Sequence, residues 1–332
     1  MEAMLEKRSA ESHADSTILD STRNLGESSE SSNSSESILD SLSNDCAIDS
    51  AHFATSNDFI LQVPMIRVDT KPSLKNLATP QNNPYYEKSV DFSDEVDFII
   101  KEERVSFYLN GTKIISTMCL PHDQDAHILG FLFNEGVIES YSAVRSIKVA
   151  KDGLSVFIEA KINEENIANL YHEKTLTSGC CVGVSANFDG KVLERFVSSK
   201  VRFNIADLCE KIAEFEKESE LFNLTGCVHK VMIFCGNSVF QSEDIGRHNA
   251  LDKAIGKAIM AEADLSGAVL IVSGRLSMEM VIKCAMSGIP LVISRAATTA
   301  LGIKSALKLG ITLVGFARNG KLNIYTHKAR IV

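Results

Sequence analysis

The sequence predicts an α/β protein in which a three-layer, mixed-sheet domain follows a smaller α+β domain. Two patterns carry this prediction: strand and helix signals alternate through the second half of the chain, and a hairpin, a helix and two more strands precede them. With 332 residues, of which 45% are apolar, the chain is long enough to bury the cores of two domains. A different composition at the amino terminus predicts a leader that belongs to neither domain.

Residues 1–60 form this predicted leader. They contain 12 Asp and Glu against three Lys and Arg, so they carry the whole net charge of −9. The stretch GESSESSNSSES and the scarcity of clustered apolar residues favour disorder. An acidic tail repels nucleic acid and anionic membranes, so we expect neither as a partner. Residues 61–93 hold four prolines and predict a mostly irregular linker.

Residues 94–172 are expected to form the smaller domain. Alternating apolar residues predict a hairpin that turns at Asn110 and Gly111, the strongest short-range hairpin signal in the chain. A helix is expected over Asp123–Asn134, where apolar side chains share one face. Two further strands, expected over Val144–Ala150 and Leu154–Ile162, complete a small α+β domain.

Residues 173–190 are expected to form a cysteine loop around the stretch SGCCVGVS. Cys180 and Cys181 are adjacent there, and their small neighbours leave the sulfur atoms accessible, as reactive thiols are. From these residues alone, two small buried residues at a turn are an equal alternative. Four other cysteines lie in apolar surroundings and predict reduced core thiols instead of a disulfide framework, namely Cys119, Cys209, Cys235 and Cys284.

The larger domain is predicted over residues 191–332, with helices packed on a mixed sheet. A first helix is expected from Ile205 to about Leu221. The predicted strands are Val228–Cys235, Ser238–Ser242, Ala268–Ser273, Leu291–Ser294, Thr312–Phe316 and Leu322–Tyr325. The further predicted helices are Arg247–Ala261, Ser277–Ser287 and Thr298–Leu309. We expect the carboxyl ends of the parallel strands to form the ligand crevice.

Three arginines follow predicted strands directly before predicted helices. Arg247 lies in EDIGRHN, Arg275 in VSGRLS and Arg295 in ISRAATT. Exposed amides at helix amino termini attract anions, and the planar guanidinium group matches phosphate oxygens, so the recurrence predicts a polyphosphate ligand. Gly246 and Gly274 would let a phosphate approach the backbone. The alternative is that these arginines are solvated or pair with nearby carboxylates.

The stretch FARNGK, residues 316–321, ends another predicted strand and holds a turn beside two cations. By itself it is typical of a hairpin loop, but its strand would deliver it to the same crevice. The sequence has neither a GxGxxG nor a GxxxxGK motif, which excludes a standard dinucleotide or NTPase site. It also lacks a zinc-ligand pattern, so we expect no metal. No apolar run is long enough for a membrane span and no secretion signal is present, so we expect a cytoplasmic protein.

Several long motifs identify the family that this sequence resembles. They are, in chain order, TGCVH, EDIGRHNALDKAIG, GAVLIVSGRLSMEMVIK, GIPLVISRAATTALGI and ITLVGFARNGKLNIYTH. Over about residues 95–330 the chain resembles the formate dehydrogenase accessory sulfurtransferases, the FdhD family. The resemblance implies a cytidine-deaminase-like fold without the zinc of those enzymes, and a homodimer in the cytoplasm.

The resemblance also implies a reaction. A member of this family is a sulfurtransferase that takes persulfide sulfur from a cysteine desulfurase. It passes the sulfur to the bis-molybdopterin guanine dinucleotide form of the molybdenum cofactor, which it binds as a substrate. The cofactor then enters the catalytic subunit of formate dehydrogenase, whose activity requires that sulfur. A guanine nucleotide such as GDP is expected to occupy the same site.

By position, Cys180 corresponds to the persulfide-forming cysteine of the family. The residues that match its cofactor-binding segment are Phe316, Ala317, Arg318, Asn319, Gly320 and Lys321. The strand-end turns would add Arg247, His248, Ser273, Gly274, Arg275, Ser294, Arg295 and Thr298.

The cysteine loop departs from the family pattern in one respect. Many members carry CGxC, whereas this chain has CCVG, so the second cysteine is adjacent to the first. We therefore expect Cys180 alone to carry the persulfide and Cys181 to be an auxiliary thiol. Two other functions stay open: a noncatalytic chaperone that binds the cofactor for formate dehydrogenase, and a nucleotide deaminase, which the missing metal ligands disfavour.

Overall fold

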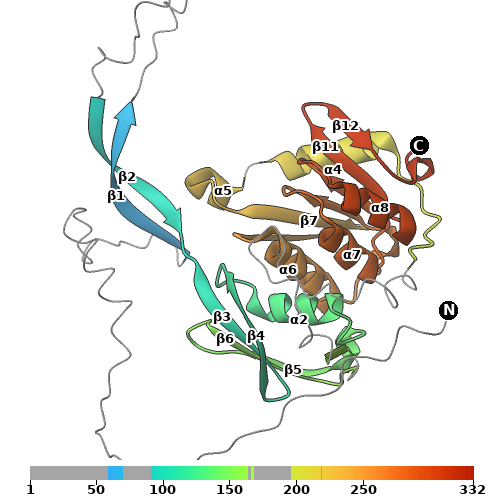
Figure 1. The fold of residues 1–332 in the computed structure, drawn as a ribbon, viewed down its shortest axis with the longest axis horizontal. Coiled ribbons are helices and arrows are strands. Elements are labelled where there is room, and N and C mark those ends of the chain that lie inside the picture. The colour runs from blue at the N-terminus through green and yellow to red at the C-terminus, as the bar shows by residue number, and fades with distance from the viewer. Residues whose placement is uncertain (1–58, 70–90, 164–165, 168–195, 218) are drawn as a thin grey trace, which may run out of the picture. The chain divides into compact units, whose positions relative to one another are not determined.

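The computed structural model describes residues 59–69, 91–163, 166–167, 196–217 and 219–332. Its first two strands, β1 (Ile60–Asp69) and β2 (Asp91–Ile100), pair as an antiparallel ribbon (Figure 1). The prediction of a mostly irregular linker is therefore wrong for residues 61–69 and 91–93. Pro64 lies inside β1, opposite Val96, and a two-stranded ribbon tolerates proline because each strand has one unpaired edge. The expected leader lies, up to residue 58, outside the described residues.

The smaller domain is a four-stranded sheet with one helix packed on it. The spatial order of its strands is β4 (Thr112–Cys119), β3 (Glu103–Leu109), β6 (Ser155–Ala160) and β5 (Val144–Val149). The hairpin turns at Asn110 and Gly111, which both have positive φ angles, as the sequence predicts. A short 3-10 turn, Tyr141–Ala143, precedes β5. Helix α2 (Gln124–Asn134) covers one face, where Ile128 and Leu132 pack with Phe107 in a buried core.

The larger domain is built on a six-stranded mixed sheet. The spatial order of its strands is β12 (Lys321–Ile324), β11 (Thr312–Arg318), β10 (Leu291–Ser294), β9 (Val269–Val272), β7 (His229–Cys235) and β8 (Ser238–Asp244). Strands β9, β10 and β11 are parallel, whereas β7 is antiparallel to both β9 and β8. The three parallel strands are mostly apolar and almost entirely buried, as strands covered on both faces are.

Helices cover both faces of this sheet and make three layers. Helix α4 packs on one face through Leu208 and Phe215, and α6, α7 and α8 pack on the other. The helices are α4 (Ile205–Glu216), α5 (Glu220–Thr225), α6 (Arg247–Met260), α7 (Met278–Met286) and α8 (Ala300–Leu309). Short 3-10 turns follow at Leu265–Gly267 and Lys328–Arg330. The described part of the chain therefore confirms the expected fold class, a three-layer mixed-sheet domain with a smaller α+β domain.

The single helix expected from Ile205 to about Leu221 is two helices. Helix α4 ends at Glu216, and α5 begins after Ser219, whose hydroxyl accepts a hydrogen bond from the Phe222 amide at 3.0 Å. A serine hydroxyl that caps an amino terminus competes with continued helix. The apolar periodicity continues across the break, which is why it predicted one helix.

Helices α2 and α6 cross with their backbones in contact (Figure 1). A Cβ atom added at Gly130 would overlap the Asp252 carbonyl oxygen, and one added at Gly256 would overlap the Ala126 carbonyl oxygen. Only glycine permits this approach from both helices. The crossing joins the smaller domain to the helix layer of the larger one.

We predict that Gly256→Ala destabilises the protein by about 3 kcal/mol, because the new methyl group would force the two helices apart. Chemical denaturation followed by circular dichroism measures the change. Gly267→Ala is the matched control, since its Cβ would have one neighbour, a Val201 methyl group at 3.8 Å. Its effect should stay below about 0.5 kcal/mol. Equal destabilisation by the two variants would contradict the close approach.

Candidate functional site: the arginine edge

Four strands of the large sheet end at the same edge. Strands β8, β9, β10 and β11 run in one direction, so their carboxyl ends lie together, and the antiparallel β7 begins there with His229. Arg247 begins α6 directly after the loop that follows β8, and the loops after β9 and β10 carry Arg275 and Arg295, as the sequence predicts. We call this set of loops, with His229, the arginine edge.

Hydrogen bonds join the loops of the arginine edge to one another. The Ser273 hydroxyl accepts from the Lys230 amide at 3.0 Å and lies 3.3 Å from His229 Nδ1. The Ser294 hydroxyl donates to the Gly274 carbonyl at 2.7 Å. The Thr298 hydroxyl in turn donates to the Leu276 carbonyl at 3.2 Å. Of the predicted site residues, Ser273, Gly274, Ser294 and Thr298 therefore bind neighbouring loops and fix their positions.

Several buried polar atoms at the same edge have no partner in the described part of the chain. Arg247 Nε, Glu243 Oε1 and Ser277 Oγ are buried and have no hydrogen-bond partner among the described residues. Gly274 packs against Arg247, since a Cβ atom added there would lie 3.2 Å from Arg247 Cβ. Arg275 and Arg295 are exposed, and Arg295 Nε lies 3.8 Å from Glu216 Oε1. Buried polar atoms nearly always have partners, so this edge is suited to a polar, anionic ligand.

The two histidines of the edge differ in their surroundings. Burial and the Arg247 guanidinium lower the pKa of His229, which keeps its imidazole neutral. His248 is buried, with Nε2 3.2 Å from Glu279 Oε2, and burial lowers its pKa against the opposing effect of that carboxylate. The pairing with Glu279 is typical of a structural histidine. A ligand-binding role for His248 stays a prediction.

The FARNGK segment adjoins the loop that carries Arg295. The Phe316 amide donates to the Ala296 carbonyl at 3.0 Å, and Phe316 has a φ angle of 53° at a bulge in β11. Ala317 is fully buried in the core on the α4 side, so its backbone alone can contact a ligand. The rest of the predicted segment forms an exposed turn between β11 and β12, namely Arg318, Asn319, Gly320 and Lys321.

A buried ion pair that the sequence analysis missed supports the amino terminus of α6. Asp244 and Lys253 are 0% exposed, and Lys253 Nζ lies 2.6 Å from Asp244 Oδ2. Asp244 also accepts from the Gly246 amide at 2.9 Å and from the Leu120 amide at 3.1 Å. Lys253 donates to the Leu120 carbonyl at 2.8 Å. The pair thus ties the loop that carries Arg247 to the smaller domain.

The signal for this pair was a lysine on an apolar helix face. Lys253 lies among Ala250, Leu251 and Ala254, where a charged residue is unusual unless it has a buried partner. Its partner precedes the same helix, but the third member, Leu120, belongs to the smaller domain. Sequence alone does not bring it near.

The five described thiols range from fully buried to exposed, and Cys227 is one of the exposed ones. Burial raises the pKa of Cys119 to about 11 and that of Cys284 to about 12, so both are inert core thiols, as expected. Cys209 is exposed, which corrects the prediction of a core position, because it faces away from the sheet on α4. Cys235 is partly buried.

The expected reactive thiols, Cys180 and Cys181, lie outside the described residues. The described residues that flank their segment are held at the carboxyl ends of two helices. Asn166 Nδ2 donates to the Gly136 carbonyl after α2 at 2.6 Å, and the Val197 amide donates to the Leu309 carbonyl of α8 at 2.8 Å. A reactive thiol beside the arginine edge therefore stays a prediction.

The structure was also compared with what a metal site or a membrane-spanning helix requires. Among the described residues, no group of three or more His, Cys, Asp or Glu side chains is placed to hold a metal ion. None of the described helices is both long and apolar enough to cross a membrane.

We predict that Lys253→Met destabilises the protein by about 3–5 kcal/mol, because it leaves the Asp244 carboxylate buried without its cation. The double variant with Asp244→Asn should show a favourable coupling of about 2 kcal/mol in a double-mutant cycle. Denaturant unfolding measures all three variants. Strict additivity of the two single effects would contradict a direct pair.

Comparisons with known proteins place the chain in a family. The profile of the FdhD/NarQ family matches residues 100–332. A sulfur carrier protein FdhD from Wolinella succinogenes is 55% identical over 240 residues, which cover 72% of this chain and 84% of that protein. One of the same name from Shouchella clausii is 32% identical over 71% of this chain and 90% of its own length.

A solved structure shows the same fold. It is that of a protein described as a formate dehydrogenase accessory protein from Desulfotalea psychrophila, with a TM-score of 0.61 and 24% identity, over 82% of this chain and 99% of that one. The profile match and the identities over most of the curated relatives' length lead to one conclusion: this chain belongs to the FdhD/NarQ family.

Proposed function

We propose that this protein is a sulfur carrier required for formate dehydrogenase activity. It accepts persulfide sulfur from a cysteine desulfurase and transfers it to the molybdenum cofactor, in its bis-molybdopterin guanine dinucleotide form, before the cofactor enters the formate dehydrogenase catalytic subunit. Support comes from the relatives, which carry the name sulfur carrier protein FdhD and match this chain over most of their length.

The observation that carries this proposal in the structure is the arginine edge. The cofactor is a substrate rich in phosphate, and three arginines at one sheet edge suit its negative charge. Arg247 is held by the buried Asp244–Lys253 pair and keeps a buried Nε without a partner among the described residues. The exposed Arg275, Arg295 and the FARNGK turn would complete the contact with phosphates or guanine, and a guanine nucleotide such as GDP would bind there.

The sulfur-transfer step is exchange at a persulfide. The Cys180 thiolate attacks the terminal sulfur of the desulfurase persulfide, a new S–S bond forms on Cys180, and the desulfurase leaves with its own thiolate. The Cys180 persulfide would then pass its terminal sulfur to the cofactor, bound as a substrate: the S–S bond breaks, Cys180 leaves as the thiolate, and the molybdenum of the cofactor would supply the two electrons that reduce the sulfur to sulfide. Cys181 is an auxiliary thiol in this scheme. The inert Cys119 and Cys284 take no part.

We propose that the protein works in the cytoplasm as a homodimer. Two exposed apolar residues of the ribbon support a second copy, because Ile66 is 65% exposed and Val96 is 57% exposed. A two-stranded ribbon is marginally stable by itself, so a partner that covers these residues would stabilise it.

We predict that Cys180→Ala abolishes persulfide formation and that Cys181→Ala retains it. Mass spectrometry after incubation with a cysteine desulfurase and cysteine detects the added sulfur on the peptide that contains both residues. Cys209→Ala, which removes an exposed thiol, is the control and should load normally. Persulfide on the peptide of Cys180→Ala would overturn the assignment. Rescue of formate dehydrogenase by Cys180→Ala would favour the noncatalytic chaperone instead.

We also predict that binding of GDP takes up a proton at His229. Burial and Arg247 lower the pKa of this residue. A phosphate beside Arg247 offsets the guanidinium charge and raises the pKa of His229. The affinity for GDP should therefore increase as the pH falls from about 7.5 to about 6, because protonated His229 favours the bound state. The gain is at most about tenfold per pH unit.

Calorimetry in buffers of different ionisation enthalpy measures this proton uptake. His229→Gln should lose it, whereas the titration of the nucleotide's own phosphate is common to both proteins. The exposed His122, changed to Gln, is the control and should keep the uptake. Equal uptake by the wild type and His229→Gln would contradict the placement of the phosphate.

A further inference from the structure

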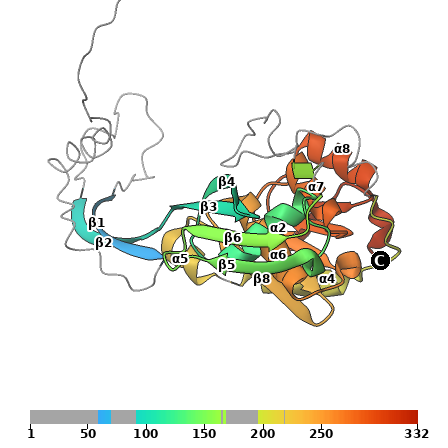
Figure 2. The same cartoon turned by 90° about the horizontal axis from the view of Figure 1, so that it is seen from below.

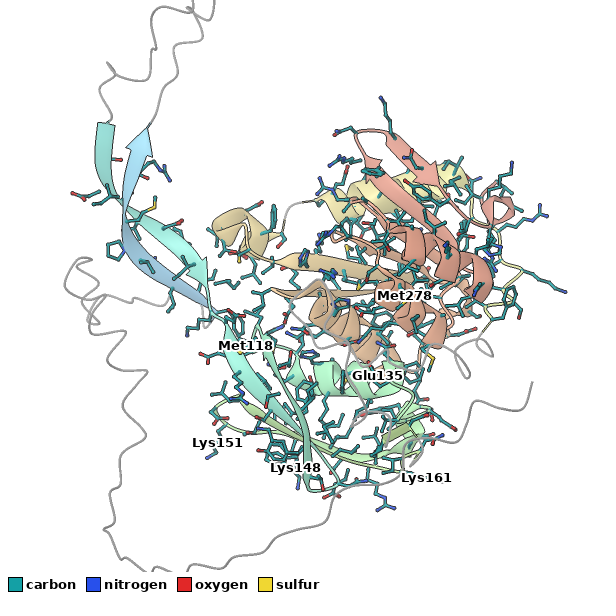
Figure 3. The ribbon with its side chains drawn as sticks, in the orientation of Figure 1. Met118, Glu135, Lys148, Lys151, Lys161 and Met278 are labelled. Atoms are coloured by element: carbon teal, nitrogen blue, oxygen red, sulfur yellow. The ribbon has the colours of Figure 1, made fainter. Side chains whose placement is uncertain are left out.

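A cavity of about 470 Å³ lies where three helices end, at the opposite end of α6 from the arginine edge. Phe133 and Ile259, from the last turns of α2 and α6, line it together with Ser287, which follows α7 directly. Figure 3 labels Glu135 directly after α2 and Met278 at the other, amino-terminal end of α7. We call this space the helix-end cavity.

The walls of the helix-end cavity are mainly apolar. Tyr141 lies in the turn that leads from α2 into β5, and β5 lies in front of α2 when the molecule is seen from below (Figure 2). Phe133 and Ile259 pack against the cores of both domains, and Leu265 is buried in the core of the larger one. Apolar walls with a few polar groups are typical of small-molecule sites, which have volumes of roughly 300–1,000 Å³.

The charged side chains that line the cavity are all acidic. They are Glu139, Glu262 and Asp264, and among the described residues that line the cavity none is Lys, Arg or His. Glu139 and Glu262 are exposed and have no ion pair with another described residue. Hydrogen bonds from Ser266 lower the pKa of Asp264, which keeps that carboxylate ionised at neutral pH. The cavity therefore presents three negative charges.

The helix ends add to this negative charge. The carboxyl end of a helix carries a partial charge of about −0.5, so three such ends favour a cation. The lysines in the last turns of α6 and α7 are engaged elsewhere: Lys257 pairs with Asp123. Lys283 pairs with Asp252. Because α6 and α7 begin at the arginine edge, one end of each helix suits an anion and the other end suits a cation.

Glu262 occupies a position where glycine is usual. Helices α6 and α7 both end in a Schellman motif, and in α6 the Ala263 amide donates to the Ala258 carbonyl at 3.0 Å. This motif contains one left-handed residue, which is Gly288 with a φ angle of 71° after α7 but Glu262 with a φ angle of 51° after α6. The chain therefore keeps a carboxylate beside the cavity where glycine would be less strained.

We propose that the helix-end cavity binds an aliphatic polyamine, in which ammonium groups are joined by short methylene chains. The ammonium groups pair with the carboxylates of Glu139, Glu262 and Asp264 and face the helix ends. The methylene chain packs on Tyr141 and Leu265.

Charge complementarity selects this ligand over an anion, and the apolar walls select it over an inorganic cation. In the part of the chain that the structure describes, no group of three or more His, Cys, Asp or Glu side chains is placed to hold a metal ion. An organic cation fills an apolar cavity that a hydrated ion would leave unpaired. This inference goes beyond the proposed function and does not depend on it, so each can fail without the other.

Saturation-transfer NMR tests the binding with cadaverine, a five-carbon diamine, as the probe. We expect transfer from the full chain to the methylene protons of cadaverine, and none to those of pentanediol, which has the same chain without charges. Sodium chloride at matched ionic strength controls for non-specific attraction to the acidic residues 1–60. No transfer to cadaverine, or equal transfer to pentanediol, would overturn the proposal.

Glu262→Gly separates binding from folding. It puts glycine at the left-handed position and removes a carboxylate, so the denaturation midpoint should rise. The dissociation constant of cadaverine should increase roughly threefold to fivefold, and Glu139→Gln should increase it by a similar factor. The matched control is Glu210→Gln at an exposed position of α4, which should change neither quantity. Unchanged affinity in both cavity variants would overturn the proposal.

Methyl-resolved NMR locates the ligand. The methyl signals of Ile259 and Leu265 should shift on titration with cadaverine, whereas those of Leu208, which packs under α4, should not. Equal shifts at all three residues would contradict the location. A lysine side chain of another protein carries the same ammonium group. Tighter binding of a blocked glycine–lysine–glycine peptide than of cadaverine would assign the cavity to such a partner and overturn the proposal of a free polyamine.

Discussion

The contact between α2 and α6 is the constraint on which the rest of the structure depends. Two glycines, Gly130 and Gly256, remove the Cβ atoms that would hold the helix axes apart, so each backbone touches the other. Buried polar groups then extend the contact: Asn134 of α2 donates to Asp252 of α6, which also accepts from Lys283 of α7 at 2.6 Å. A buried carboxylate needs such partners, and they exist only when these three helices lie in one arrangement.

Helix α6, which takes part in this contact with α2, also begins at the arginine edge. Arg247 is the first residue of this helix, and Asp244 and Lys253 hold the loop before it to Leu120 of the smaller domain. The position of one guanidinium is therefore decided jointly by both domains. A site whose cations are already in place loses less conformational entropy when an anion binds. The hydrogen bonds among Ser273, Ser294 and Thr298 give the neighbouring loops the same preorganisation.

Charged side chains of this protein lie both in its core and at its surface. Asp244 and Lys253 neutralise each other inside the protein, whereas Arg275 and Arg295 of the arginine edge are exposed. The buried pair stabilises one arrangement of helices, whereas the exposed guanidinium groups have the charge and geometry that suit phosphate oxygens. The arginine edge also contains buried polar atoms that have no hydrogen-bond partner within the part of the chain that the structure describes.

By itself the sequence determined the features that depend on local pattern. The strand Leu291–Ser294 has the bounds that were predicted, the turn at Asn110 and Gly111 is present, and the arginines follow the strands as expected, because apolar runs and turn residues act over a few positions. Tertiary structure alone decided the rest. The pairing of β1 with β2, the contact of Leu120 with Lys253 133 residues away, and the alignment of Lys113, Tyr108, Phe157 and Lys148 all require a register between distant segments. Such register is set by packing across the whole fold, which local periodicity does not encode.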